Sequence, residues 1–295
     1  MRVFVTGATG FVGSAIVQDL LKAGHQVLGL VRSDASAQAL AATGAEVHRG
    51  SLEDLDSLQR GASQADGVIH TAFIHDFANF EASCAVEQRV IGALGDALAG
   101  TDRPLLVTSG TGLLASGRLA TEDDANASSF PRVVSERETE ALAARGVRAS
   151  IVRLPPTVHG KGDHGFVPML IQLAREKGVS AYIGSGSNHW PAVHRLDAAH
   201  LYRLAIEKGV GGVRYHAVAE EGVSFRDIAT AIGRHLSLPV VSKTPEEAAG
   251  HFGWLAHFTQ MDNLASSRKT REQLAWQPDH ATLLADLDEG HYFSA

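Results

Sequence analysis

The chain has 295 residues, of which 44% are hydrophobic, and it carries a formal net charge of −7 and a single cysteine, Cys84. This length allows one large core with a smaller lobe, whereas a negative charge without a basic cluster argues against nucleic-acid partners. The lone cysteine excludes an internal disulfide, no apolar run has membrane-spanning length, and the N-terminus leads straight into an apolar strand. We therefore expect a cytoplasmic protein without a membrane partner. Fifteen histidines without ligand spacing predict no metal site.

The first apolar run, residues 3–5, leads into the turn Thr-Gly-Ala-Thr-Gly-Phe-Val-Gly and then into a helical segment, residues 14–22. This order places free backbone N–H groups at a helix N-terminus, where a diphosphate can bind. Gly7 permits the tight turn, Gly10 lets the backbone approach phosphate, and Gly13 lets the helix pack closely. A glycine-rich turn without a ligand is the less favoured alternative. The residues predicted to hold the cofactor here are Gly7, Thr9, Gly10, Phe11, Val12 and Gly13.

Short apolar runs alternate with segments of helical period along the first half of the chain. The runs lie at residues 3–5, 27–31, 45–48, 67–70, 105–107 and 150–153. This alternation predicts an α/β fold of the Rossmann type, with a doubly wound parallel sheet. The pattern breaks after Pro155. We therefore expect a dinucleotide-binding domain at residues 1–155 and a smaller C-terminal substrate lobe at residues 156–295, partly interleaved with the first.

Helix-start signals follow in the second half. Thr244 to Glu247 read Thr-Pro-Glu-Glu, which predicts a capping box with proline at the first helical position. Asp197 is interpreted as the cap of a helix at residues 198–207 rather than as a catalytic group.

Three later segments accompany the Gly-x-x-Gly-x-x-Gly turn. Residues 68–72 read Val-Ile-His-Thr-Ala, residues 153–160 read Arg-Leu-Pro-Pro-Thr-Val-His-Gly, and residues 190–197 read Trp-Pro-Ala-Val-His-Arg-Leu-Asp. Together with the turn they resemble the short-chain dehydrogenase/reductase superfamily, in its extended and atypical, NAD-dependent epimerase/dehydratase-like branches. The resemblance covers nearly the whole chain and departs at His159, where the family usually has tyrosine.

The resemblance implies further cofactor contacts and an assembly. Residues 50–54 are similar to the family's turn beside the adenine, with Ser51 in place of aspartate. Residues 68–72 are similar to the family's segment beside the ribose and nicotinamide. The contacts it implies are Ser51, Leu52, Thr71, Ala72, Phe73, Thr108 and Pro155. It also implies a homodimer, paired through helices expected at residues 79–99 and 130–145.

The end of the second strand favours NADP(H) over NAD(H). An NAD site needs a carboxylate there for the ribose hydroxyls, but Val31 holds the place and Arg32 follows. A guanidinium can give charge-assisted bonds to a 2′-phosphate. Two alternatives are that Asp34 serves as a displaced acceptor and that Arg32 is a solvated loop cation.

The superfamily's catalytic Tyr-x-x-x-Lys pair is absent from its expected place. Aligning residues 135–140 with the family's Ser-Lys-x-x-x-Glu helix puts Arg132 at the tyrosine and Glu136 at the lysine, which resembles the atypical branch. Arg132 could stabilise an alkoxide, because a guanidinium stays charged. Glu136 is interpreted as an ion-pair partner of Arg132 one helical turn away, or as an acid if burial raises its pKa.

Four side chains are therefore candidates for catalysis. Ser109 and Thr111 flank Gly110, which stands at the family's serine, and their hydroxyls could donate to a substrate oxygen. His75 and His159 could titrate near neutrality and deliver a proton, although each is equally well a loop histidine without catalytic duty.

Aromatic residues near these candidates indicate a hydrophobic small-molecule substrate, unless they belong to the core. They are Phe73, Phe77, Trp190, Trp254 and Phe258. We predict an NADPH-dependent reductase of a small or medium apolar carbonyl compound. The alternatives are a catalytically silent NADP-binding sensor and, ranked last because such reactions depend most on the tyrosine, a sugar-nucleotide epimerase or dehydratase.

Overall fold

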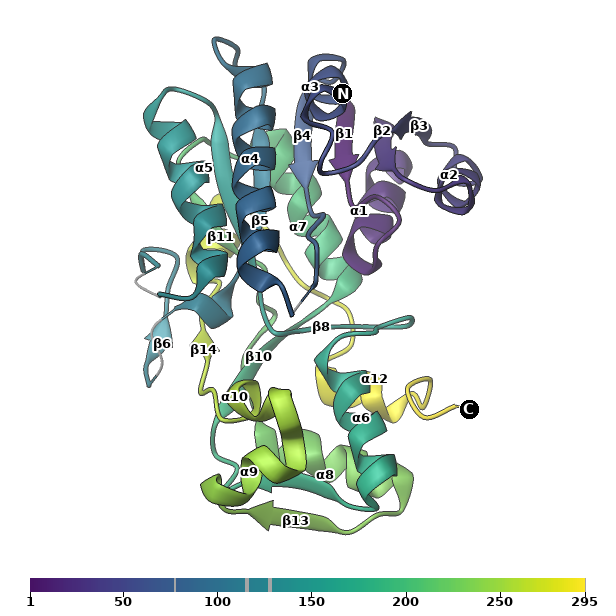
Figure 1. Cartoon of the computed structure of the whole chain (residues 1–295), viewed down its shortest axis with the longest axis vertical. Helices are drawn as coiled ribbons and strands as arrows, with labels where there is room; N and C mark the ends of the chain where they lie inside the picture. The colour runs from purple at the N-terminus through teal and green to yellow at the C-terminus, as the bar shows by residue number, and fades with distance from the viewer. Residues whose placement is uncertain (77, 115–116, 127–128, 295) are drawn as a thin grey trace.

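A seven-stranded parallel sheet forms the centre of the computed structural model, which describes residues 1–76, 78–114, 117–126 and 129–294 (Figure 1). The strand order is β11-β7-β5-β4-β1-β2-β3, and every neighbouring pair is parallel. The strands are β1 (Arg2–Thr6), β2 (Gln26–Val31), β3 (Glu46–Arg49), β4 (Gly67–His70), β5 (Leu105–Gly110), β7 (Ala149–Leu154) and β11 (Arg214–His216). The predicted doubly wound fold is confirmed, because the order reverses between β1 and β4.

Helices cover both faces of this sheet. Their apolar side chains form two separate core clusters, one on each side. One face carries α1 (Phe11–Lys22), α2 (Asp34–Ala41) and α7 (Arg195–Lys208). The other carries α3 (Leu55–Ser63), α4 (Phe80–Leu98) and α5 (Val134–Ala144). The sheet is therefore buried on both sides, as its apolar strands require.

The C-terminal lobe is built from short strands and helices. A three-stranded sheet contains β8 (Thr157–His159), β10 (His189–His194) and β12 (Glu220–Ser224). Two pairs are parallel, namely β9 (Ser180–Ile183) with β13 (Val240–Lys243), and β6 (Leu119–Ala120) with β14 (Leu264–Ala265). The helices are α6 (Phe166–Lys177), α8 (Phe225–Leu236), α9 (Pro245–Phe252), α10 (Ala256–Thr259) and α12 (Leu283–Asp288). The remaining helix of this half, α11 (Arg268–Leu274), packs on α7 and β11 of the large-sheet part. Short 3₁₀ turns lie at Thr111–Leu113, Pro131–Val133 and Gly253–Leu255.

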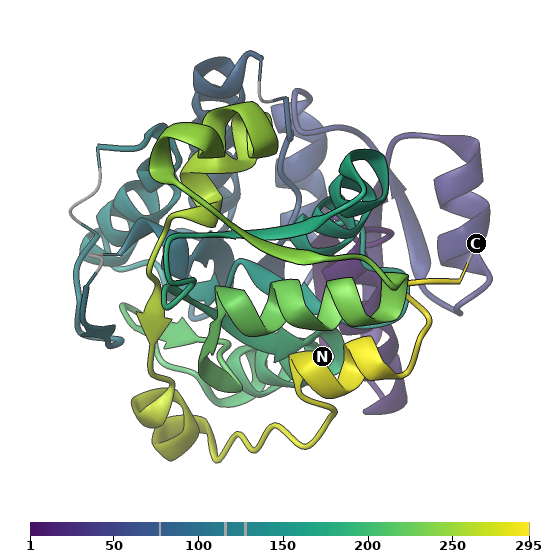
Figure 2. The ribbon, with the colours of Figure 1, turned by 90° about the horizontal axis from the view of Figure 1, so that it is seen from below.

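The two parts of the chain are interleaved. After β7 the chain enters the lobe, returns to the large sheet for α7 and β11, and then runs back through the lobe to α12. Seen from below, α8 and α12 lie side by side across the lobe (Figure 2). Because α7 begins at the end of β10, its first residues lie where the C-terminal lobe and the part built around the large sheet meet.

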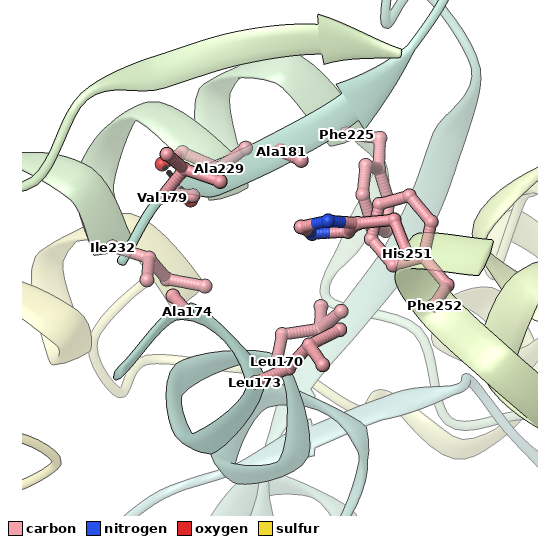
Figure 3. A pocket seen from close by; sticks show the side chains of 11 residues that line it. Leu170, Leu173, Ala174, Val179, Ala181, Phe225, Ala229, Ile232, His251 and Phe252 are labelled. Carbon is pink, nitrogen blue, oxygen red and sulfur yellow. Dashed lines mark hydrogen bonds between the residues drawn. The ribbon is translucent and has the colours of Figure 1, made fainter. Parts of the chain in front are cut away.

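The lobe has its own apolar core with a small cavity in it. Figure 3 shows this cavity between α6, α8 and α9, where Leu170, Ile232 and Phe252 contribute to its lining. Trp190 is fully buried in the same core and packs on Phe225. Of the two interpretations of Trp190, the one as a core residue is therefore confirmed, because other core side chains surround it.

Local helix signals had mixed outcomes. Thr244 and Glu247 form the predicted capping box, with Pro245 at the start of α9. Asp197 does not cap its helix: α7 begins earlier, at Arg195, and the ring of His194 accepts the backbone N–H of Leu196. No helix among the described residues is long and apolar enough to cross a membrane.

Candidate active site

The glycine-rich turn between β1 and α1 has the geometry expected of a phosphate-binding loop. Gly7 has a φ of +70°, and a Cβ there would lie 2.7 Å from Thr71 Oγ1. A Cβ on Gly13 would lie 2.0 Å from the carbonyl oxygen of Gly7, so the helix can only approach the turn through glycine. Gly10 is the N-cap of α1, and no side chain caps this helix. Its first N–H groups therefore form a donor set that fits the diphosphate of a nicotinamide dinucleotide.

The segment after β4, which contains Thr71 and Ala72, lies directly against this turn. Thr71 Oγ1 donates to the carbonyl oxygen of Thr6 at 2.8 Å, and the Ala72 N–H donates to Thr6 Oγ1 at 3.3 Å. Thr108, in the second half of the neighbouring strand β5, donates from Oγ1 to the carbonyl oxygen of His70 at 2.8 Å. These bonds place the carboxyl ends of β1, β4 and β5 in one row, where ligands of doubly wound sheets bind.

Two arginines stand at the other end of this row. Val31, the last residue of β2, is paired in register with Arg49, the last residue of β3. Arg32 is exposed and forms no hydrogen bond or ion pair with another residue that the structure describes. Asp34 is ion-paired with the guanidinium of Arg49. The alternative acceptor for an NAD ribose is thus already engaged by a cation. Ser51 and Leu52 follow β3, and both are half-buried.

Arg132 lies over the aromatic ring of Phe73 and forms an ion pair with a buried carboxylate. Its guanidinium carbon is 4.1 Å from the Phe73 ring centroid, and Nη2 donates to the carbonyl oxygen of Thr108 at 3.2 Å. Nη1 lies 3.1 Å from Glu87 Oε1, and the side chain of Glu87 is only 1% exposed. Arg132 itself is 16% exposed, so its charge stands at the edge of the row of strand ends.

Glu87 is the centre of a buried network that connects Arg132 to the glycine-rich turn. Its carboxylate also accepts from Ser135 Oγ at 3.0 Å and lies 3.1 Å from His70 Nε2. The other ring nitrogen of His70 is 2.7 Å from Thr6 Oγ1. Burial raises the pKa of Glu87, but His70 and Arg132 outweigh it, so the pKa lies below 4.5. Sequence reasoning missed Glu87, although a glutamate among the alanines and valines of residues 82–90 is a visible signal.

The predicted ion pair between Arg132 and Glu136 is wrong. Glu136 is buried and pairs with Arg153, whose Nε and Nη2 lie 2.8 and 2.7 Å from its two carboxylate oxygens. Arg132 belongs to a 3₁₀ turn and α5 begins only at Val134. The two side chains therefore do not share the face of one α-helix, which the one-turn spacing had assumed.

Three of the four predicted catalytic side chains lie in buried networks. Ser109 Oγ donates to Glu136 at 2.7 Å, and Thr111 Oγ1 donates to Asn263 at 2.8 Å with no exposed surface. His159 is also fully buried, with Nδ1 2.8 Å from Asp286 and its ring edge-on to His194. The structure thus brings Ser109 close to Glu136 but places His159 in the lobe, at the end of β8.

His75, the fourth candidate, lies beside Arg132. Its exposed side chain packs edge-on to Phe73, with ring centroids 5.1 Å apart. Loss of water around the ring, followed by the charge of Arg132, lowers the pKa of His75 below 6.5. Phe73 in turn packs on Phe80, and Phe80 on Phe130, at centroid distances of 5.7 and 5.0 Å.

The other aromatic candidates separate into different environments. Trp254 is 52% exposed on the lobe, while Phe258 is half-buried against the lobe core. Phe77 lies outside the described residues.

Pro155, a predicted cofactor contact, is buried where β7 leads towards β8. Tyr202 is buried on α7 with its hydroxyl 2.7 Å from Thr108 Oγ1, and burial raises its pKa.

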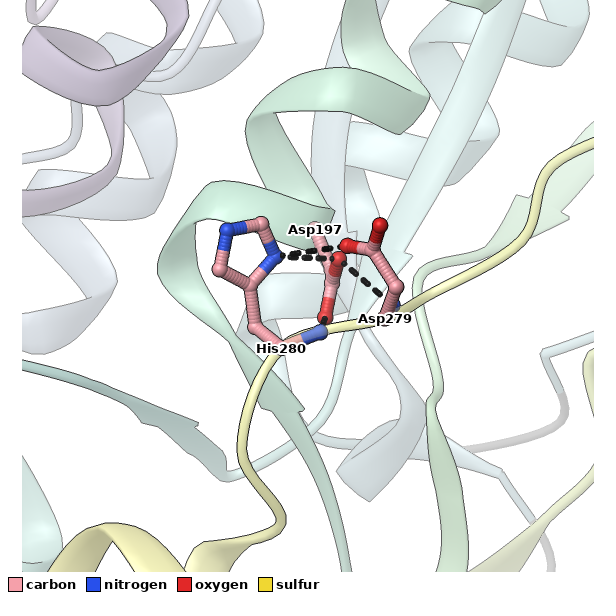
Figure 4. A group of neighbouring side chains, drawn as sticks. All are labelled: Asp197, Asp279 and His280. Carbon is pink, nitrogen blue, oxygen red and sulfur yellow. Dashed lines mark hydrogen bonds and ion pairs between the residues drawn. The ribbon is translucent and has the colours of Figure 1, made fainter.

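Asp197 binds the C-terminal segment and does not have the predicted role as a helix cap. Its carboxylate receives the N–H groups of Asp279 and His280 at 3.1 and 3.2 Å and lies 2.7 Å from His280 Nδ1 (Figure 4). The His280 ring is stacked on His194, with the planes 8° apart. Asp197 therefore fastens the C-terminal segment to the start of α7.

Comparison with known proteins identifies the family of this chain. The model of the NAD dependent epimerase/dehydratase family matches residues 3–218. The chain belongs to this family. It is 55% identical over 295 residues to an uncharacterized protein of Schizosaccharomyces pombe, covering 99% of this chain and all of the relative.

More distant relatives are characterised. A 4-hydroxy-2-methyl-3-oxo-4-farnesyl-3,4-dihydroquinoline-1-oxide ketoreductase of Stigmatella aurantiaca is 28% identical, over 79% of this chain and 72% of its own length. The solved UDP-glucose 4-epimerase of Thermus thermophilus, in complex with NAD, has a TM-score of 0.77 at 20% identity, with both chains fully covered, and this likeness shows the fold. Members of the family work with a nicotinamide dinucleotide, and the glycine-rich turn and its uncapped helix fit that cofactor.

Proposed function

We propose that this chain is an NADP(H)-dependent reductase of an apolar carbonyl compound, in which Arg132 stabilises the developing oxyanion and His75 delivers the proton. The observation that carries the proposal is the guanidinium of Arg132, partly exposed and packed on Phe73, beside the segment that follows β4. Similarity to a ketoreductase supports carbonyl reduction as the reaction.

The bound cofactor would supply a hydride to the carbonyl carbon. Negative charge then develops on the carbonyl oxygen, and a fixed cation stabilises it without reorganisation at the moment of reaction. Arg132 fits this role because Glu87 and the carbonyl oxygen of Thr108 hold its guanidinium in place. Arg132 cannot give up a proton near neutral pH, so a second group must protonate the alkoxide.

His75 fits the second role. Its exposed ring packs on the same phenylalanine as the guanidinium of Arg132. Reduction consumes a proton, so a histidine donor makes the rate rise as the pH falls towards its pKa. Ser109, Thr111 and His159 remain predictions as catalytic residues, and their burial favours positioning roles.

Preference for NADP(H) is supported by Arg32 and Arg49 at the ends of β2 and β3. Arg32 is exposed at the place where a 2′-phosphate would lie, and Asp34 is engaged by Arg49. An NAD ribose would meet two cations and no available carboxylate among these residues, whereas a 2′-phosphate gains charge-assisted bonds.

An apolar substrate is supported by the aromatic side chains beside Arg132. Phe73, Phe80 and Phe130 pack in a row, and Phe130 is 38% exposed. Binding an apolar ligand to such a surface is favourable by about 25 cal/mol for each Å² of apolar area that is removed from water.

We also propose a cytoplasmic homodimer paired through α4 and α5. Light scattering would test the dimer.

The test is NADPH oxidation across a panel of aldehydes and ketones, with NADH alongside. Arg132→Met and His75→Gln should each lower kcat by about 10² or more, because one oxyanion donor or one proton donor contributes that much. Arg103→Met is the matched control, since Arg103 binds backbone carbonyls on the opposite end of the sheet. Cofactor binding without turnover of any carbonyl compound would overturn the reductase in favour of a sensor.

A further inference from the structure

Arg195, the first residue of α7, reaches the first turn of α1. Its Nη2 lies 3.2 Å from Ser14 Oγ, and its guanidinium carbon is 4.7 Å from the ring centroid of Phe11. Nη1 donates to the carbonyl oxygen of Lys161 at 3.0 Å. A cation from the junction of the two lobes therefore stands at the end of the helix that follows the glycine-rich turn.

The backbone around Arg195 is built for this close approach. Gly160 has a φ of +132°, and a Cβ there would lie 3.0 Å from Arg195 Cγ and 2.9 Å from His194 Nε2. His164, on the same loop, packs edge-on to Phe11 at a centroid distance of 5.8 Å. The loop after β8 and the start of α7 thus face the first turn of α1 together.

The charge of Arg195 is not balanced by the residues around it. No carboxylate of the described part of the chain pairs with it, and its Nε is buried without a hydrogen-bond partner there. Burial lowers its pKa. The guanidinium also faces a helix N-terminus, which carries the equivalent of about half a positive charge. That turn contains no acidic residue and no side-chain cap.

Two positive groups at one partly buried place repel each other, and an anion between them would relieve both. We propose that Arg195 binds the diphosphate of the nicotinamide dinucleotide, on the side opposite the glycine-rich turn, and so couples cofactor binding to the contact between the two lobes. This inference rests on cofactor binding by the chain. It depends neither on preference for NADP(H) nor on carbonyl reduction.

The experiment compares Arg195→Met, which keeps the aliphatic stem on Phe11 but removes the charge, with Arg195→Lys, which keeps the charge. Dissociation constants are measured by calorimetric titration with NADPH, NADH and ADP-ribose, which share the diphosphate. Adenosine 2′-monophosphate, which lacks the diphosphate, is the fourth ligand. Melting temperatures of the variants without ligand report their folding.

Arg195→Met should weaken NADPH, NADH and ADP-ribose alike by about tenfold or more, since a hydrogen bond to a charged group contributes that much. Arg195→Lys should recover part of this loss, and the salt dependence of binding should be shallower in Arg195→Met. Adenosine 2′-monophosphate should bind Arg195→Met and the parent protein with equal affinity.

Unchanged affinity for all four ligands with a lower melting temperature would overturn the proposal and leave Arg195 as a purely structural contact. Equal weakening of adenosine 2′-monophosphate would also overturn it, because the effect would then not follow the diphosphate. If the proposed preference for NADP(H) is wrong, a different result is expected: Arg32→Ala would leave the affinity for adenosine 2′-monophosphate unchanged.

Discussion

Replacing Glu87 with glutamine should destabilise the protein strongly, because donors from three elements converge on this carboxylate. His70, Arg132 and Ser135 all lie within 3.1 Å of it, and the side chain is 1% exposed. Removing one partner of a buried ion pair costs about 3–5 kcal/mol, since the remaining charge stays buried without compensation. We expect Glu87→Gln to lower the free energy of unfolding by an amount at the lower end of this range, because an amide still accepts one hydrogen bond.

The assay is urea unfolding at pH 7, with Glu140→Gln as the matched control. Glu140 pairs with Arg214 at 2.5 Å but is 44% exposed, so its loss should cost less than about 1 kcal/mol. The folded-state pKa of Glu87 lies below 4.5, so its contribution is complete above that pH and declines as the pH falls towards the folded pKa. The difference between the parent protein and Glu87→Gln should therefore shrink at pH 3.5. Equal losses for Glu87→Gln and Glu140→Gln at pH 7 would refute this reasoning.

Four further outcomes follow from the structure. Arg32→Ala should raise the dissociation constant of NADPH about tenfold and leave NADH within a factor of two, and an equal rise for both would contradict the assignment. His75→Gln should abolish the increase of the reductive rate between pH 8 and pH 6, and a pH profile unchanged in shape would remove His75 as the donor. Gly13→Ala should weaken every nicotinamide nucleotide, because its Cβ would lie 2.0 Å from the Gly7 carbonyl oxygen and backbone must move. Gly250→Ala, with open space around its Cβ in α9, should instead raise stability by about 0.5–1 kcal/mol in the same unfolding assay.

Most of the predictions that the structure confirmed rest on residues that lie close together in the sequence. The glycine spacing of residues 7–13 needs only the steric limits of a turn and one helix, and Gly7 does adopt a positive φ. The capping box at Thr244 is likewise formed within four residues. The apolar runs also identified six strands of the large sheet, because a strand buried on both faces is apolar throughout. The seventh strand, β11, was missed because its residues, Arg214, Tyr215 and His216, do not form an apolar run.

The sequence by itself therefore determined the fold class, the family and the position of the glycine-rich turn, since each depends on short-range sterics and periodicity. The tertiary structure decided which charges meet. Glu87 reaches Arg132 from a helix 45 positions away, Glu136 turns to Arg153, and Asp197 binds His280 from 83 positions away. Such pairs arise when helices pack on the sheet, so spacing along the chain carries no record of them. The same packing brings Arg195 to Ser14 across 181 positions.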